Sequence, residues 1–298
     1  LSHGAASFFV ATMVAGLCAA GAQMIVPFAA SLAPEESRGR TIGNVMGGLL
    51  TGIMLARPAA SLTASLFGWR AIFWIAAAVL LLFAIVLTRV LPERRPSGEN
   101  YGRILRSMAN ILRTTPQLRR RAAYQGLAFA TFNIFWTTAP LMLGDDFGFG
   151  QRGIALFALA GAGGALAAPI AGRIGDRGHV KLGTGLALLA ITVSALLSGV
   201  AVAFHLLIAV TLFAIVLDAG VQVNQVLGQR VIYSLPGEHR GRYNALYMTI
   251  VFVVGAGGSA MATLAYHAAG WWGAMGAAMA LGVLVLALFA TELRGAKA

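Results

Sequence analysis

The segment Leu182–Val200 reads LGTGLALLAITVSALLSGV and contains no charged residue. A helix of about 20 such residues crosses the roughly 30 Å hydrocarbon core of a bilayer. This segment therefore predicts a membrane-spanning helix. The whole chain shares its character, because 58% of its 298 residues are hydrophobic and only 11% are charged, which sets it apart from soluble domains.

Further apolar runs of similar length lie on both sides of this segment. They are rich in Ala, Gly and Leu and show no period-two alternation of polar and apolar residues, which favours helices over the strands of a membrane barrel. We therefore expect an all-α membrane protein with nine transmembrane helices. The other eight runs are Ala5–Ala33, Thr41–Phe67, Ala71–Thr88, Ala122–Gly144, Gly153–Gly172, Leu206–Gly228, Ala245–Tyr266 and Gly273–Thr291.

The basic residues fall between these runs in a regular order. Of the 22 Lys and Arg residues, 19 lie in five alternate connecting segments, namely 34–40, 89–121, 173–181, 229–242 and 292–298. Basic loops stay on the cytoplasmic side of a membrane. We therefore expect a multi-pass membrane protein with these segments and the C-terminus in the cytoplasm and the N-terminus outside.

The net charge of +12 is then a signal of membrane topology, and we expect no nucleic-acid partner. The single cysteine, Cys18, cannot form a disulfide within the chain, and the five His residues show no metal-ligand spacing. Disulfide-stabilised scaffolds and zinc hydrolases are excluded on these grounds. We expect no metal and no cofactor.

The longest connecting segment, 89–121, carries nine Arg residues and two Glu residues. Apolar residues repeat in it at helical spacing, namely Ile104, Leu105, Met108, Ile111 and Leu112. This pattern predicts a basic amphipathic helix that rests on the anionic inner surface of the membrane, with lipids as its partner. A calmodulin-type or nucleic-acid site is the alternative interpretation.

An internal repeat relates the two ends of the chain. A shift of 202 residues places Pro34–Arg40 on Pro236–Arg242 and Gly68-Trp69 on Gly270-Trp271 without a gap. We infer that spans one to three and spans seven to nine are copies of one unit. The same shift places counterparts of spans four to six before Leu1, so we expect a twelve-span parent protein whose first three spans this chain lacks.

The repeat and the long basic segment together predict a domain organisation. Residues 1–88 form the remaining three helices of an N-terminal bundle, and residues 89–121 form a cytoplasmic linker. Residues 122–298 form a six-helix C-terminal bundle.

Two segments resemble motifs of a known transporter family. Gly172–Lys181, GRIGDRGHVK, is similar to the G-x-x-x-D-R-x-G-R-R loop of the major facilitator superfamily and lies between two predicted spans. Pro34–Arg40 and the glycines after it resemble the Gly-rich antiporter motif in the fifth span of that family. The chain thus resembles the bacterial efflux branch, the drug/proton antiporters and arabinose-efflux-permease-like proteins, and this resemblance implies a place in the bacterial inner membrane.

The resemblance implies two six-helix bundles and transport by alternating access, but this chain departs from the motifs at two places. Arg57-Pro58 stands where the antiporter motif usually has Gly-Pro. Thr12–Gly16 stands where efflux members often carry an Arg within R-x-x-Q-G. Proton coupling through that Arg is therefore not expected here.

Asp218 is the only acidic residue within the predicted spans. A charge there is costly unless it is paired, hydrated or protonated. Gln222, Gln225 and Gln229 follow at i+4, i+7 and i+11, which places the four side chains on one helical face. We expect this face to line a wet cavity in which Asp218 accepts a proton and the amides bind a polar substrate. The alternative is a structural tie between Asp218 and a neighbouring helix.

Two further polar features lie within the predicted spans. Arg57 attracts an anionic substrate group, pairs with Asp218, or makes a structural contact, and the sequence leaves these alternatives open. In the fourth span, Asn133 and Thr137 share a helical face, and we expect them to line the cavity wall together with Trp136. Packing of Trp136 against lipid or another helix is the alternative.

The Gly172–Lys181 loop offers one carboxylate, Asp176, among basic residues. We expect Asp176 to cap a helix or to pair with a basic residue of a neighbouring span, so that it closes the cytoplasmic end until the contact breaks during alternating access. A topology anchor is the alternative. The expected gating residues are Gly172, Arg173, Asp176, Arg177 and Lys181.

Small residues are concentrated in several of the spans. Close approach of membrane helices needs such residues, often as G-x-x-x-G pairs. We expect helix packing at Gly43, Gly47, Gly48 and Gly52, and at the clusters Gly161, Gly163, Gly164 and Gly255, Gly257, Gly258.

The motifs of intramembrane or nucleotide-dependent enzymes are missing, since the sequence contains no G-x-S-x-G, H-E-x-x-H or Walker loop. We therefore expect a monomeric secondary transporter of a small molecule that is driven by a proton gradient and works by proton-coupled efflux. A proton-coupled uptake permease of the same fold is the first alternative. A membrane scaffold or sensor that transports nothing is the second.

Overall fold

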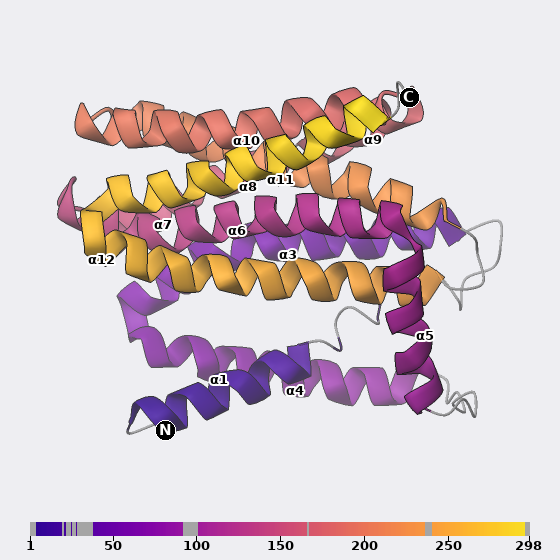
Figure 1. The fold of residues 1–298 in the computed structure, drawn as a ribbon. Helices are drawn as coiled ribbons and strands as arrows, with labels where there is room; N and C mark the ends of the chain where they lie inside the picture. The colour runs from indigo at the N-terminus through magenta and orange to yellow at the C-terminus, as the bar shows by residue number, and fades with distance from the viewer. Residues whose placement is uncertain are drawn as a thin grey trace. The chain divides into compact units, whose positions relative to one another are not determined.

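The computed structural model describes residues 4–19, 21, 25, 28, 38–91, 101–165, 167–235 and 240–295. Within these residues the regular structure is helical, with no strand (Figure 1). The described residues form two compact units, Leu1–Ala56 and Arg57–Ala298. The helices are α1 (Ala5–Ala19), α3 (Arg38–Phe67), α4 (Trp69–Val90), α5 (Tyr101–Thr114), α6 (Pro116–Asp145), α7 (Gln151–Ala158), α8 (Ala160–Ala165), α9 (Ala167–Asp176), α10 (Val180–Ala203), α11 (Leu207–Tyr233) and α12 (Arg240–Gly295).

Most of the predicted spans correspond to a helix of the expected length. Helices α4, α6, α10 and α11 cover the third, fourth, sixth and seventh apolar runs, and each is long and apolar enough to cross a membrane. Helix α3 covers the second run, and α1 covers the first half of the run Ala5–Ala33, whose remainder lies largely outside the described residues. The expectation of an all-α membrane protein is thus confirmed.

The fifth apolar run, Gly153–Gly172, was expected to form a single helix, and this was wrong. Helix α7 ends at Ala158 and α8 begins at Ala160, with a 3₁₀-type turn at Leu159 between them, and α8 and α9 lie on either side of residue 166, which is outside the described residues. The local sequence favours the break at Leu159, because the three glycines of α8 lower its helix propensity.

The eighth and ninth runs lie in α12, which bends sharply in its middle. Ala269 and Gly270 leave the helical conformation, and Gly270 has φ 58°. The equivalent residue of the repeat, Gly68, joins α3 to α4 with φ 80°. Such φ values favour glycine. Because α3 and α12 also begin 202 residues apart, the sequence repeat is matched by the same helix–turn–helix element in both places.

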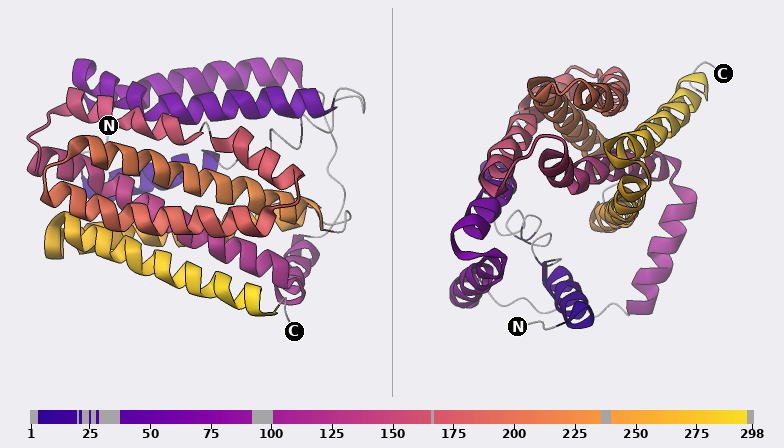
Figure 2. Two further views of the ribbon diagram at one scale, coloured as in Figure 1. Left: turned by 90° about the horizontal axis from the view of Figure 1, so that it is seen from above. Right: turned by 90° about the vertical axis from the view of Figure 1, so that its left-hand side faces the viewer.

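Helices α6, α10, α11 and the two limbs of α12 run side by side and enclose the core of the second unit (Figures 1 and 2). Its buried residues come from all four helices and include Phe135, Leu188, Leu217 and Ala278. Close contacts between backbones contribute to this packing. A Cβ on Gly258 would lie 2.6 Å from the Ala130 Cα, so only glycine allows α12 to approach α6 there.

Helix α10 distributes its polar and apolar residues over its two faces as a helix of a membrane protein does. Its exposed face carries large apolar residues at helical spacing, whereas its buried face is small and hydroxyl-rich, with Gly183, Thr184, Ser194 and Ser198. A helix in a water-soluble bundle has the opposite arrangement. The exposed face therefore suits contact with lipid. Its residues are Leu182, Leu186, Leu189, Val193 and Leu196.

One end of the bundle carries most of its charged residues, and we call it the basic end. It comprises the start of α6 at Arg119–Arg121, the turn between α9 and α10, and the last turn of α11 at Arg230. Helix α5 packs here and lies at a steep angle to α6 (Figure 1). Ile111 of α5 is buried among apolar residues of the bundle, in a junction cluster with Leu118, Ala122, Ile232, Tyr243, Tyr247 and Val251.

Candidate functional site

The acid in the middle of the bundle is held by an indole. Asp218 of α11 is 7% exposed, and its Oδ1 accepts a hydrogen bond of 2.8 Å from Trp136 Nε1 of α6. Glycines of α8 make room for the carboxylate. A Cβ on Gly161 would lie 3.0 Å from Asp218 Oδ2, and one on Gly164 would overlap the Asp218 Cβ and the backbone nitrogen of Ala219. The glycine cluster of the fifth span thus packs α8 directly against this acid.

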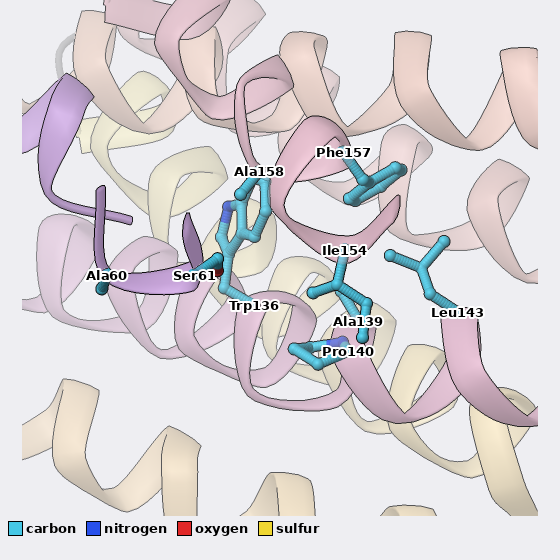
Figure 3. A pocket seen from close by; sticks show the side chains of 9 residues that line it. All are labelled: Ala60, Ser61, Trp136, Ala139, Pro140, Leu143, Ile154, Phe157 and Ala158. Atoms are coloured by element: carbon cyan, nitrogen blue, oxygen red, sulfur yellow. The ribbon is translucent and has the colours of Figure 1, made fainter. Parts of the chain in front are cut away.

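A pocket of about 270 Å³ lies beside the same indole (Figure 3). Its volume is just below the range of roughly 300–1,000 Å³ that small-molecule sites occupy. Almost all of its lining is apolar, and Trp136 contributes both to this lining and to the hydrogen bond with Asp218. The lining residues are Ala60 and Ser61 of α3, Trp136, Ala139, Pro140 and Leu143 of α6, and Ile154, Phe157 and Ala158 of α7.

A cluster of amides, two buried and one half-buried, lies along the same two helices, nearer the basic end. Gln125 Nε2 donates to Gln225 Oε1 at 3.4 Å, and Asn224 Nδ2 donates to Gln125 Oε1 at 2.6 Å. Gln225 follows Asp218 by seven residues, which is about 10 Å along a helix. Gln125 and Asn224 were missed by the sequence reasoning. A helical wheel of α6 could have found Gln125, which lies eleven residues before Trp136 and hence on the same face.

Not every predicted polar residue contributes to this region. Asn133 Nδ2 donates to the Gly255 carbonyl oxygen at 2.9 Å, so this side chain ties α6 to α12 instead of lining the pocket. Thr137 is exposed. Gln222 and Gln229 are half-buried on α11. The residues predicted for the cavity wall therefore point to different neighbours.

Part of the expected site falls outside the described residues. Arg57 belongs to α3, but its side chain is among the parts not described, and so are the surroundings of Gly43 and Gly47. A Cβ on Gly48 or Gly52 would meet nothing within 4 Å. In the described part of the chain, Gly164 and Gly258, from the other two expected clusters, show close packing.

The predicted gating loop ends α9 and pairs with α11. Gly178, with φ 77°, and His179 close the helix with backbone bonds to the carbonyls of Gly175 and Ile174, the pattern of a Schellman turn. Asp176 accepts a hydrogen bond of 2.5 Å from Arg230 Nη1.

Gly175 of α9 packs closely against the Arg230 side chain. A Cβ on Gly175 would lie 2.9 Å from the Arg230 Cδ, so Gly175 lets the Arg230 side chain cross α9 and reach Asp176. The remaining residues of the expected gate, Arg173, Arg177 and Lys181, are exposed, and Gly172 has open space beside it.

A second ion pair at the basic end was not foreseen. Arg121 Nη1 donates to Thr184 Oγ1 at 2.9 Å, and its Nη2 lies 3.4 Å from Glu292 Oε1. Tyr124 donates to the other oxygen of Glu292 at 3.0 Å. These contacts join α6, α10 and the end of α12, and the Arg121 side chain is 6% exposed. No sequence signal announces this pairing, since both charges flank apolar runs and are 171 residues apart.

The chemistry of the site follows from these groups. The carboxyl group of Asp218 can exchange a proton, and the indole N–H and the amides can bind a polar group. These groups include no nucleophile activated by a base. Among the described residues, no group of three or more His, Cys, Asp or Glu side chains could hold a metal.

Comparison with known proteins shows which family and which relatives the chain is similar to. Residues 1–258 match the model of the Major Facilitator Superfamily. The chain is 39% identical over 276 residues to a protein named uncharacterized transporter YgaY from Escherichia coli O157:H7, covering 91% of this chain and 69% of that protein. It is 32% identical over 280 residues to a protein named probable transporter SCO4007 from Streptomyces coelicolor, covering 92% of this chain and 64% of that one.

A further relative carries a more specific name. A chloramphenicol resistance protein from Streptomyces lividans is 30% identical over 168 residues, which is 55% of this chain and 43% of that protein. The family match and the names of the relatives indicate a transport protein, which agrees with the helical membrane fold. The chain therefore belongs to the Major Facilitator Superfamily and is a multi-pass membrane transport protein, not an enzyme.

Proposed function

We propose that this chain belongs to a secondary active transporter that exports a small molecule in exchange for protons by alternating access. The observation that carries the proposal is the 2.8 Å hydrogen bond between Trp136 Nε1 and the buried Asp218, beside an apolar pocket that Trp136 also lines. An acid that deep in a membrane bundle is a functional group by default, because its burial is costly.

The indole suits a carboxyl group that gains and loses a proton. Trp136 can only donate, and its N–H can bond to the carboxylate or to the carbonyl oxygen of the neutral acid. Either state of Asp218 therefore keeps a hydrogen bond. The proton gradient would supply the energy, with no cofactor, and Asp218 would be the group that takes up and releases the proton.

The pocket suggests where the substrate meets this acid. Its wall is apolar apart from the Ser61 hydroxyl and the indole, so a substrate in this pocket would make mainly apolar contacts. A polar group of the substrate would reach Asp218 directly or would replace the Trp136 N–H as its hydrogen-bond partner. Substrate binding and protonation of Asp218 would then compete at one place, which is how an antiporter couples the two fluxes.

We assign the basic end of the bundle to the cytoplasm of a bacterial cell. The alternation of basic segments along the sequence supports this orientation, and it puts the C-terminus inside. Asp176 and Arg230 would then form part of the cytoplasmic gate. Their pair joins α9 to α11, it is exposed to solvent, and such a pair can break at small cost when the end opens.

The export direction rests on similarity to a protein named for chloramphenicol resistance. An uptake permease with the same proton chemistry is the alternative, and the test below separates the two. Everted membrane vesicles would be prepared from cells that express the protein from its complete gene. Substrate-triggered dissipation of a proton gradient would be followed across a panel of antibiotics and sugars.

Wild type would be compared with Asp218→Asn and with Asp146→Asn, at matched protein levels. Asp146 is an exposed acid after α6, so it controls for the same chemical change outside the bundle. We expect wild type and Asp146→Asn to respond to a subset of compounds, and Asp218→Asn to respond to none. An equal response of Asp218→Asn would contradict the proposal, and a response confined to right-side-out vesicles would assign uptake.

A further inference from the structure

Helix α5 lies across the basic end of the bundle in a fixed position. It makes a steep angle with α6 (Figure 1), and in the end-on view it runs away from the start of α6 at the edge of the bundle (Figure 2). Helix α6 is long and apolar enough to cross a membrane. A helix at a steep angle to α6 therefore runs nearly parallel to the membrane surface, the orientation of an interfacial helix.

Two contacts hold α5 in this position. Ile111 is 6% exposed within the junction cluster, where it packs with residues of α6, α11 and α12. At the other contact, Arg119 Nη1 donates to the carbonyl oxygens of Arg113 at 2.6 Å and Leu112 at 3.4 Å, which caps the last turn of α5. The helix thus has one buried side, and its remaining sides have a defined direction.

The exposed sides of α5 combine an apolar edge with basic residues. Leu105 is 56% exposed, and Arg103, Arg106 and Arg113 are also exposed. At 100° per residue, Leu105 lies between the buried side and the side of Arg106 and Arg113. Residues 101–121 contain six Arg and no acidic residue. Within the described part of the chain, none of the three exposed arginines of α5 forms an ion pair.

We propose that the exposed arginines of α5 bind the anionic phospholipid headgroups of the membrane that the bundle crosses, and that Leu105 inserts at the acyl boundary. Charge complementarity favours this occupant, because arginines beside an exposed leucine match a surface that is anionic above and apolar below. Continuity favours it as well, since α5 is attached to membrane-crossing helices. A nucleic acid would use the charge but would leave Leu105 in water.

The test uses the protein expressed from its complete gene and reconstituted in lipid nanodiscs. In a Cys18→Ser background, a nitroxide on Leu105→Cys would report relative access to oxygen, which partitions into lipid, and to a water-soluble nickel chelate. Asn110→Cys provides the matched control, because Asn110 is exposed on the polar side of the same helix. Nanodiscs of phosphatidylcholine alone would be compared with nanodiscs that also contain phosphatidylglycerol.

We expect phosphatidylglycerol to shift the label on residue 105 toward oxygen access and to leave the label on residue 110 in water. Each basic residue at an anionic surface strengthens binding about fivefold. Replacing Arg103, Arg106 and Arg113 by Gln should therefore abolish the shift, and replacing them by Lys should retain it.

Three outcomes would overturn the proposal. The first is equal water access of the residue 105 label in both lipid compositions. The second is a phosphatidylglycerol shift that survives the triple Gln replacement. The third is immobilisation of the label by added RNA or by an acidic peptide without any response to phosphatidylglycerol, which would assign this side of α5 to another class of partner.

Discussion

The middle of the bundle and its basic end hold their acids in different ways. At the basic end, Asp176 and Glu292 each face a guanidinium, from Arg230 and Arg121. In the middle, Asp218 accepts a hydrogen bond from an uncharged indole. An ion pair fixes the charge of its carboxylate, whereas an N–H donor serves both the charged and the neutral acid. This hydrogen bond supports our proposal that a proton is exchanged in the middle of the bundle, and the two ion pairs support a mechanical role for the basic end.

The two ion pairs of the basic end differ in how far their side chains are exposed to solvent. The side chains of Arg121 and Glu292 are 6% and 14% exposed, whereas those of Arg230 and Asp176 are 46% and 72% exposed. Breaking a buried pair leaves an unpaired charge in a poorly hydrated place, and breaking an exposed pair leaves hydrated charges. Arg121 and Glu292 therefore lock α6, α10 and α12 together, and Arg230 and Asp176 can separate easily.

The largest expected effect comes from breaking the buried pair. Glu292→Ala should lower the free energy of unfolding by about 3–5 kcal/mol, because Arg121 stays buried without its carboxylate and the Tyr124 hydroxyl keeps only the longer bond to the Leu288 carbonyl oxygen. Thermal unfolding of the purified protein in detergent would measure the loss. Glu292→Ala together with Arg121→Met should recover part of it. A melting temperature of Glu292→Ala equal to that of wild type would show that the pair does not lock the bundle.

The next effect tests the packing around the central acid. Gly164→Ala would place a methyl group against the Asp218 Cβ and the Ala219 backbone, so α8 must move away from α11. Overpacking of this kind costs about 1–3 kcal/mol. Gly172→Ala is the control, because a Cβ there would meet no atom within 4 Å. If both variants unfolded at the wild-type temperature, α8 would not pack against Asp218 as described.

Comparison with the sequence shows which of these features a linear pattern can predict. Hydropathy located the helices, because a membrane span needs its apolar residues in one continuous run. The repeat located the turns at Gly68 and Gly270, since φ values of 80° and 58° favour glycine in both copies. Asp218 could be singled out because one acid in an apolar run is costly.

Partners across helices could not be predicted in the same way. Trp136 is 82 residues from Asp218, and Arg121 is 171 residues from Glu292. Which faces meet depends on how the helices pack, and a periodic pattern gives only the direction of a side chain on its own helix. The break at Leu159 was also missed, because hydropathy does not register a turn within an apolar run.

The smallest expected effect concerns the exposed pair. Arg230→Ala should change the free energy of unfolding by less than about 1 kcal/mol, because the guanidinium and Asp176 are both largely hydrated. The same variant should make the basic end open more often, which would appear as faster labelling of a cysteine introduced at Val231 in place of the valine. A loss of stability as large as that of Glu292→Ala would mean that the two pairs do not differ in kind.

The central claim, that Asp218 exchanges a proton beside Trp136, can be tested without knowing the substrate. Tryptophan fluorescence of the purified protein in nanodiscs would be titrated over a broad range of pH for wild type, Asp218→Asn and Trp136→Phe. Because the Trp136 N–H bonds to Asp218, a change in the charge of the acid should alter the emission of the indole. The account predicts a transition in wild type that both variants lose. The same transition in Asp218→Asn, or none in wild type, would contradict it.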